Sequence, residues 1–352
     1  MPKIITLPGL VDVHTHLREP GATQKEDFET GTKAAVAGGY TAILDMPNNP
    51  IPTVSEKTLE QKINLAKGRI YTDVGFNFGA TVKNSKIFSK IQDKVFGLKV
   101  YMNHTTGDLL IEDEKALEAV FSRWPKGKII MVHAEGETLI KAINLAKKFK
   151  SKLHICHVAT KKEIELIKQA RVDGLNISCE VSCNHLFLTE EDAKKLGPYG
   201  KVRPPLATKE DQEALWENLD VIDMIASDHA PHTKEEKEIP NPPNGVPGLE
   251  TSLPLLLIAV NDGRLTIERL IQLTSENPRK IFNIPEQPDT YVEVDPTIRY
   301  TLNAEHLFTK CSWTPFAGME VTGKINRVVL RGQVVFEEGA VFGPFGKVIF
   351  PL

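Results

Sequence analysis

Eight apolar runs of strand length alternate along this 352-residue chain with segments whose apolar residues recur at helical spacing. Regular alternation of this kind is typical of parallel sheets, and eight repeats predict a (β/α)8 TIM-type barrel. The expected strands are residues 7–13, 41–45, 73–79, 96–102, 128–133, 153–158, 175–181 and 221–226. The clearest expected helices are residues 25–37, 55–67, 112–123, 135–148 and 161–171.

The C-terminal part of the chain has a different pattern. A proline-rich loop (239–248) and two helical segments (249–260 and 266–275) follow the eighth strand, and residues 291–295, 327–332 and 334–338 then alternate like strands. We expect a barrel over residues 1–284 and a small β appendage packed on it over residues 285–352. A doubly wound open sheet is the alternative, although no Gly-x-Gly-x-x-Gly turn follows an early strand.

Two histidines, His14 and His16, stand one residue apart at the end of the first expected strand. Strand alternation predicts that residues 12, 14 and 16 share one face and that residues 11, 13 and 15 share the other. Two imidazoles on one face can chelate a metal ion, and Arg18 two residues later would hold an anion beside it. An isolated His-x-His is more often a pair of surface or core histidines, so the other strand ends decide between these readings.

Catalytic residues of such barrels lie at the carboxyl ends of the strands. The ends of the expected strands carry four histidines and one aspartate. These are more ligands than one hydrolytic zinc needs, since it takes three protein ligands and a water. They suit two ions if Lys99, as a neutral amine, reacts with carbon dioxide to give a bridging carbamate; a lysine that reaches solvent is the alternative. The residues at or near the strand ends are His14, His16, Lys99, His133, His157 and Asp228.

Several motifs in the chain resemble the amidohydrolase superfamily and, within it, the dihydroorotases. The family's Asp-x-His-x-His-x-Arg-x-Pro-Gly motif is met by residues 12–21, and its Met-Pro-Asn signature by residues 46–48. Its Gly-x-Lys segment is met by residues 97–99 and its Ser-Asp-His-Ala-Pro-His signature by residues 227–232. Residues 154–159 and 202–204 further resemble the dihydroorotase domain of the animal multifunctional pyrimidine-synthesis protein.

The resemblance implies two Zn²⁺ per chain. One would be bound by His14, His16 and Asp228, and the other by His133 and His157, with carboxylated Lys99 bridging them. A hydroxide between the ions would attack the ring amide of L-dihydroorotate, with Asp228 as general acid and base. The reverse direction closes N-carbamoyl-L-aspartate to the ring in de novo pyrimidine biosynthesis. The implied substrate-binding residues are Arg18, Asn48, Arg203, His232 and Asn244.

Weaker signals surround this set. Thr105 and Thr106 lie in the loop after the fourth strand and are candidates for a lid that closes on the substrate, or for plain solvated loop. Cys156 and Glu180 could extend the metal cluster. Alternation, however, turns Cys156 outward as a packed core thiol unless the strand bulges, and Glu180 would then support a ligand from behind.

Composition narrows the classes of partner. A net charge of −3 gives no basic footprint for nucleic acid, and no segment approaches the ~20 apolar residues of a membrane span. The four cysteines show no disulfide framework, which favours a reducing, cytoplasmic compartment. The resemblance implies a homodimer and, for some relatives, association with an aspartate transcarbamoylase.

Two rival functions stay open. A hydantoinase, dihydropyrimidinase or allantoinase shares the metal ligands, but Arg18 favours a substrate that carries a carboxylate. A catalytically silent homologue that acts as an assembly partner is the rival from another class. Silent relatives typically lose metal ligands, whereas all six positions survive in this chain.

Overall fold

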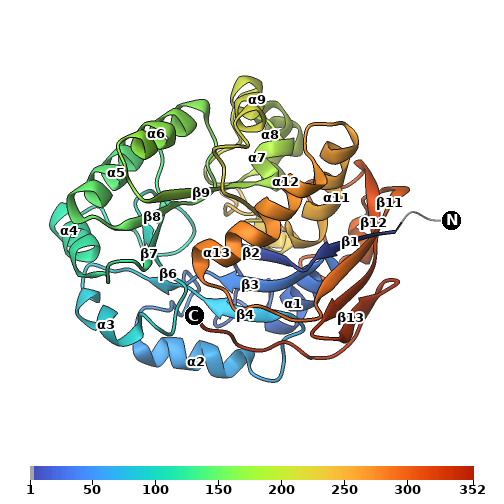
Figure 1. Ribbon diagram of the computed structural model, residues 1–352, viewed down its shortest axis with the longest axis horizontal. Helices are drawn as coiled ribbons and strands as arrows, with labels where there is room; N and C mark the ends of the chain where they lie inside the picture. The colour runs from blue at the N-terminus through green and yellow to red at the C-terminus, as the bar shows by residue number, and fades with distance from the viewer. Residues whose placement is uncertain (1–3) are drawn as a thin grey trace.

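The computed structural model describes residues 4–352, and its centre is a ring of parallel β-strands (Figure 1). Six strands are hydrogen-bonded in the order β10-β9-β8-β7-β6-β5, and three in the order β2-β3-β4. The two sheets adjoin at two places. At one, β4 and β5 are consecutive pieces of the same segment, and at the other Thr15 forms a parallel β-bridge with His229. With β4 and β5 counted as one strand, the ring has eight strands and agrees with the predicted barrel. Its strands are β2 (Leu10–Thr15), β3 (Tyr40–Asp45), β4 (Asp73–Phe76), β5 (Phe78–Gly79), β6 (Gly97–Tyr101), β7 (Ile129–His133), β8 (Lys152–Ile155), β9 (Ile177–Ser182) and β10 (Met224–Ala226).

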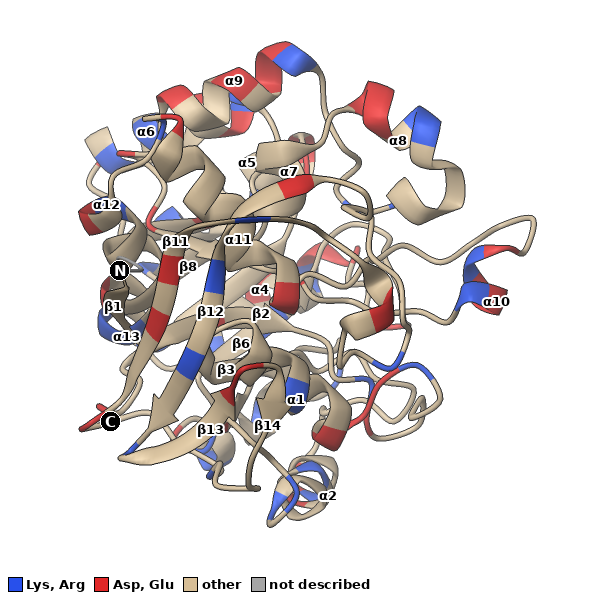
Figure 2. Ribbon diagram, turned by 90° about the vertical axis from the view of Figure 1, so that its right-hand side faces the viewer, with Lys and Arg blue, Asp and Glu red and all other residues tan. Residues whose placement is uncertain are grey.

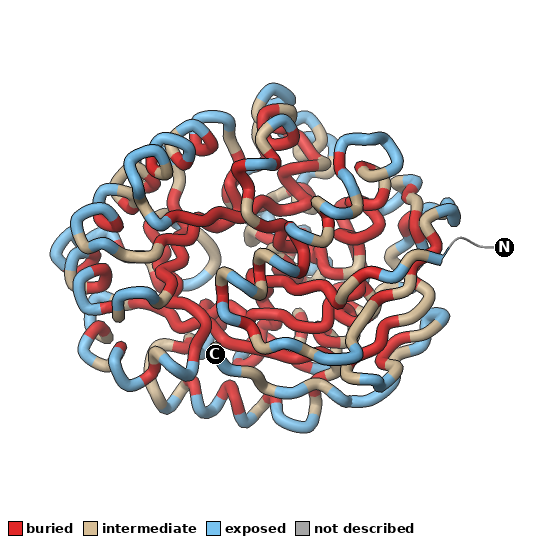
Figure 3. Tube along the Cα trace, viewed as in Figure 1, coloured by how far each residue is buried: buried red, intermediate tan, exposed pale blue. Residues whose placement is uncertain are grey.

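Helices surround the strands, with buried inner faces and exposed outer faces (Figure 3). Ser55 and Thr160 begin two of them as N-caps, since their side-chain oxygens accept from the backbone N–H three residues on. The five clearest expected helices are confirmed within three residues at each end. The helices are α1 (Phe28–Ala37), α2 (Glu56–Ala66), α3 (Phe88–Ile91), α4 (Glu114–Arg123), α5 (Glu137–Phe149), α6 (Lys161–Val172), α7 (Cys183–Phe187), α8 (Glu190–Leu196), α9 (Lys209–Glu217), α10 (Lys234–Lys237), α11 (Leu249–Asn261), α12 (Ile267–Ile271) and α13 (Asn277–Phe282).

Short helices account for most of the elements that the sequence did not predict. Helices α7, α8 and α9 occupy residues 183–217, where segments of five to nine residues are too short to show a clear helical period. The expected helix 266–275 begins as α12 and continues as a π-helical turn over Gln272–Glu276 before α13. No helix among residues 4–352 is both long and apolar enough to cross a membrane.

The first expected strand is in fact two strands that belong to different sheets. Residues Ile5–Pro8 form β1, which pairs with the appendage, and the barrel strand β2 begins at Leu10. Gly9 stands at the break, where an added Cβ would lie 2.3 Å from Thr41 Oγ1. Only glycine therefore allows the chain to pass so close to its neighbour, and a single continuous strand over residues 7–13 was wrong.

The appendage is a five-stranded antiparallel sheet in the order β1-β11-β12-β13-β14. Acidic residues of β11 are paired with basic residues of the neighbouring strand β12 (Figure 2), and Arg327 Nη1 lies 3.5 Å from Glu293. The chain then returns to the barrel, where the Val74 N–H donates to Lys347 O at 3.0 Å. The strands are β11 (Tyr291–Thr301), β12 (Glu320–Leu330), β13 (Gln333–Glu337) and β14 (Ala340–Val341).

Candidate active site

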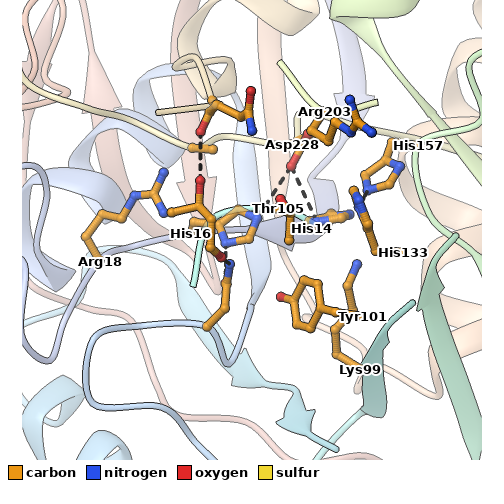
Figure 4. Close-up of a pocket in the computed structure, with 15 residues that line it drawn as sticks. His14, His16, Arg18, Lys99, Tyr101, Thr105, His133, His157, Arg203 and Asp228 are labelled. Carbon is orange, nitrogen blue, oxygen red and sulfur yellow. Dashed lines mark hydrogen bonds and ion pairs between the residues drawn. The ribbon is translucent and has the colours of Figure 1, made fainter. Parts of the chain in front are cut away.

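Three residues from two distant parts of the sequence meet where β2 and β10 adjoin. Asp228 Oδ1 lies 3.4 Å from His14 Nε2 and 3.5 Å from His16 Nε2 (Figure 4). The candidate ligand atoms of all three residues lie within 4.8 Å of one another. Such a set of two imidazoles and one carboxylate around a common point is suited to a divalent metal ion.

A second group lies beside the first on β6, β7 and the end of β8. His133 Nδ1 is 2.8 Å from His157 Nε2, and both side chains are buried. Lys99 is fully buried, and among the described residues its ammonium has no carboxylate partner. Its Nζ donates only to Cys156 Sγ, at 2.9 Å. Lys99 lines the same pocket as both groups of histidines.

The backbone at the strand ends does not follow simple alternation. Val11 and Val13 pack inside the barrel, yet His14 also faces inward, because the register of β2 against β3 shifts between Asp12 and Thr15. Asp12 does not line the pocket; its carboxylate accepts from the Ser227 and His14 N–H groups. The prediction that residues 12, 14 and 16 share a face was therefore wrong for Asp12.

Three of the candidate site residues have backbone angles in the left-handed region. The φ values are 62° at Arg18, 36° at His157 and 47° at Asp228, where non-glycine residues are rare. Each lies just beyond a strand, so the turn redirects its side chain toward the mouth of the barrel. Strained backbone of this kind clusters at functional sites because surrounding contacts hold it in place.

Cys156 and Glu180 lie beside His14, and both side chains are buried. Glu180 Oε1 accepts from His14 Nδ1, and its other oxygen lies 3.0 Å from His154 Nε2. Cys156 packs in the interior cluster with Met131 and Val13. The expected outward orientation of Cys156 was therefore wrong. The two residues and His14 bring three ligand atoms within 4.8 Å of one another, which makes a further candidate metal group.

The donors in this site fit metal ions. His133 Nε2 and His157 Nδ1 are buried without a hydrogen-bond partner among residues 4–352. Burial lowers the pKa of His16 to about 3 and the pKa of His157 well below its usual value, so both rings are neutral. Burial likewise lowers the pKa of His133. Neutral imidazoles with unshared ring nitrogens are the form that binds zinc.

His14 differs from the other histidines. Burial and the nearby Lys99 lower its pKa, but Glu180 and Asp228 outweigh them and raise it to about 10. The hydrogen bond from Nδ1 to Glu180 fixes the proton on that nitrogen and directs Nε2 toward Asp228. A carboxylate behind a histidine commonly orients a metal ligand in this way.

Arg18 and Asn48 form the side of the pocket suited to an anion. Arg18 is 5% exposed, and its Nε donates to Pro231 O at 2.9 Å while one terminal nitrogen lies 3.0 Å from His232 Nε2. Asn48 Oδ1 lies 2.8 Å from His16 Nδ1. His232 does not line the pocket but lies behind Arg18, with Lys25 Nζ 3.2 Å away.

Two loops cover the opposite side. Thr106 Oγ1 donates to Asn244 O at 3.2 Å, and Asn48 donates to Thr106 O at 2.9 Å. Arg203 lines the pocket, and its Nε donates to Glu135 Oε1 at 3.0 Å. Thr105 and Gly245 also line the pocket, whose space not filled by protein atoms is about 370 Å³ when the part open to solvent is included.

Sequence reasoning missed two residues here. Tyr101 lines the pocket and is two residues after Lys99 on β6, so the same alternation that placed Lys99 would have placed it. Glu135 connects two candidate residues, since it binds Arg203 and lies 3.4 Å from His133 Nε2. No motif marked Glu135, because this ion pair joins residues 68 positions apart.

Comparisons with known proteins agree with this geometry. Residues 5–288 match the Amidohydrolase family model. The chain is 49% identical over 348 residues to the multifunctional protein CAD of Squalus acanthias, which covers 98% of this chain but only 15% of that protein. It is 39% identical to the dihydroorotase of Pyrococcus furiosus, over 96% of this chain and 83% of that enzyme.

Two solved structures share the fold. The L-hydantoinase (dihydropyrimidinase) of Arthrobacter aurescens superposes with a TM-score of 0.93 at 30% identity, over 98% of this chain and 89% of that one. The inactive dihydroorotase-like domain of a CAD-like protein from Chaetomium thermophilum superposes with a TM-score of 0.85 at 30% identity, over 99% of each chain. From the family match and the Pyrococcus furiosus relative together, the chain belongs to the amidohydrolase family and, within it, to the dihydroorotases.

Proposed function

We propose that this protein is a zinc-dependent dihydroorotase, which interconverts N-carbamoyl-L-aspartate and L-dihydroorotate in de novo pyrimidine biosynthesis. The observation that carries the proposal is the meeting of metal-type donors with a buried guanidinium in one small pocket. Asp228 lies 3.4 Å from His14, and Arg18 lines the same space. The identity to named dihydroorotases over nearly the whole chain supports the same reaction.

The metal ligands would be the six residues at the strand ends. His14, His16 and Asp228 would hold one Zn²⁺, and His133 and His157 the other, with Lys99 as a bridging carbamate. Bound ions of this kind polarise an amide carbonyl and make hydroxide available at neutral pH. Cys156 and Glu180, together with His14, would hold an additional ion once Nδ1 of His14 has lost its proton.

Asp228 is the proposed general acid and base. Burial tends to raise its pKa, but the neighbouring His14 and His16 outweigh this effect and lower it, so the carboxylate is ionised and can accept a proton. In hydrolysis the attacking water gives its proton to this carboxylate, and its oxygen bonds to the ring carbonyl carbon. The C–N bond then breaks, and the ring nitrogen leaves with the proton from Asp228. Ring closure runs through the same steps in reverse.

Arg18 and Asn48 would bind the substrate carboxylate, with His232 holding the Arg18 side chain from behind. A planar guanidinium matches a carboxylate in two-point contact. Arg203 would contact the substrate from the other side of the pocket, and the backbone around Asn244 would contact the ring. Thr105 and Thr106 would belong to a loop that closes over the bound substrate.

The test is turnover of L-dihydroorotate by zinc-loaded protein, followed by loss of ring absorbance, with hydantoin, dihydrouracil and allantoin run in parallel. We expect dihydroorotate to be preferred and the preference to be lost in Arg18→Ala. Arg18→Lys is the matched control for charge, because it keeps the positive charge without the two-point geometry. Turnover of the neutral rings alone would assign the protein to the hydantoinases instead.

A silent assembly partner is the second candidate, because the Chaetomium thermophilum neighbour is an inactive domain of the same fold. Two bound metals per chain without turnover of any ring would favour it. Metal analysis of Lys99→Ala separates the cases further. A bridging carbamate predicts that this variant loses both the second ion and activity, whereas Lys90→Ala on the exposed face of α3 keeps both.

The assembly of the protein is also a proposal. We expect a homodimer, which light scattering would detect. Because relatives include the multifunctional protein CAD, we also propose association with an aspartate transcarbamoylase. Co-sedimentation with that enzyme is the direct check, and independent migration of the two proteins would contradict it.

A further inference from the structure

The hydroxyl of Tyr101 is a buried polar group that the proposed mechanism does not use. Tyr101 is the last residue of β6 and is 3% exposed. Its hydroxyl has no hydrogen-bond partner among residues 4–352. A hydroxyl buried in this way destabilises the folded protein unless something binds it. The pocket should therefore supply a partner that the folded chain does not.

The surroundings of Tyr101 show where that partner would lie. Its ring centroid is 5.3 Å from Lys99 Nζ and 6.1 Å from the centre of the His133 ring. In the close-up the ring lies beside Lys99, and the hydroxyl points to the side of the pocket on which His16 and Arg18 are drawn (Figure 4). Tyr101 lines the same pocket as Arg18 and Asn48, and its hydroxyl is buried at the wall of that pocket.

The hydroxyl of Tyr101 is available as a donor. A phenolic hydroxyl carries its proton near neutral pH, and this one has no hydrogen-bond partner among residues 4–352. The side chains of Arg18 and Asn48 already have protein partners, at Pro231 O and Thr106 O respectively. An anion bound on this side of the pocket would therefore gain a donor from Tyr101 that none of residues 4–352 satisfies.

We propose that Tyr101 is a specificity-determining residue whose hydroxyl donates a hydrogen bond to the carboxylate of the substrate beside Arg18. This rests on the proposed dihydroorotase function and deepens it. The contact would form equally in the ground state and the transition state, since the carboxylate lies away from the amide that reacts. It should therefore affect KM rather than kcat.

The test compares Tyr101→Phe with the unmodified protein. The substitution removes one oxygen and keeps the ring, so we expect unchanged thermal stability and metal content. The KM for L-dihydroorotate should rise about tenfold, the order expected for a hydrogen bond to a charged group, while kcat changes less than about threefold. Dihydrouracil, which has the ring without the carboxylate, is the second probe, and its inhibition constant should not change.

Tyr40→Phe is the matched control, because within the described part of the chain that hydroxyl is also buried without a hydrogen-bond partner, but it lies outside the pocket. It should leave both constants unchanged. An unchanged KM in Tyr101→Phe would overturn the proposal, and so would an equal loss for dihydrouracil, which would place the contact on the ring. A fall in metal content would overturn it too, because the hydroxyl would then act on the metal ligands.

Failure of the proposed function has a different signature. If the unmodified protein binds L-dihydroorotate in a thermal-shift titration but does not turn it over, the dihydroorotase assignment fails. The dissociation constants of Tyr101→Phe and Tyr40→Phe for L-dihydroorotate then still decide the role of Tyr101. If the unmodified protein does not bind L-dihydroorotate at all, both proposals fail.

Discussion

The buried ion pair between Lys62 and Asp45 offers a sharp test of how the anion side of the pocket is held. Both side chains are 0% exposed, and Lys62 Nζ lies 2.6 Å from Asp45 Oδ2. The same ammonium donates to Met46 O at 2.8 Å and to Asn49 Oδ1 at 2.6 Å. Asp45 Oδ1 in turn accepts from the Leu17 N–H at 2.8 Å. One lysine thus braces the segments next to Arg18 and Asn48.

We expect Lys62→Met to lower the free energy of unfolding by about 3–5 kcal/mol, because it leaves a buried carboxylate without its counter-ion. Methionine keeps most of the apolar stem, so lost packing contributes little. Burial lowers the pKa of Lys62 and raises the pKa of Asp45, and each charge offsets the cost of burying the other. The KM for the substrate should rise as well, because Leu17 precedes Arg18.

Urea denaturation followed by tryptophan fluorescence, at fixed zinc concentration, measures this loss. Lys57→Met is the matched control, since Lys57 is exposed on the same helix and should change stability by less than about 0.5 kcal/mol. Adding Asp45→Asn to Lys62→Met should restore part of the loss by removing the unpaired charge. A loss below about 1 kcal/mol in Lys62→Met would refute the argument.

Three further substitutions test other parts of the fold. Burial raises the pKa of Glu250 to about 8, so the folded state favours its protonated form and loses stability as pH rises from about 4.5 to about 8. Glu250→Gln should therefore be more stabilising at pH 8 than at pH 5 in urea denaturation, and an equal effect at both would contradict this. Gly38→Ala should greatly destabilise the protein, because its Cβ would lie 2.1 Å from Leu249 O, and circular dichroism melting would show it. Lys237→Met should raise KM and speed proteolysis of the loop over residues 239–245, since the buried ammonium donates to the carbonyls of residues 201, 243 and 245.

The barrel was predictable from the sequence because its strands are buried on both faces and separated by amphipathic helices. Such runs of apolar residues keep a clear pattern, and the strand ends carry polar residues that have no reason to be buried without a function. The candidate metal ligands could therefore be named from motifs and placed at one end of the barrel. The split at Gly9 could not be foreseen, since β1 pairs with a strand nearly 290 residues away.

The orientation of individual side chains was less predictable. Alternation failed for Asp12 and Cys156 because β2 has an irregular register and because His157 has a positive φ. Both deviations arise from contacts with other strands, such as the backbone pairing of Thr15 with His229. A sequence shows where a strand ends, but not which residue of the following turn adopts the left-handed conformation.

Substrate preference in this fold depends on the side chains that line the pocket. The L-hydantoinase of Arthrobacter aurescens shares this fold with a TM-score of 0.93, so the arrangement of strands and helices alone does not set the ring substrate. Under the proposed function, the preference for a ring with a carboxylate would come from side chains that line the pocket, and in this chain the candidates are Arg18, Asn48 and Tyr101. Arg18 would supply the positive charge. The neutral hydroxyl of Tyr101 would add a directional hydrogen bond without adding charge near the candidate metal ligands. Substitutions at Arg18 and Tyr101 should thus change the choice of substrate before they change the chemistry of ring opening.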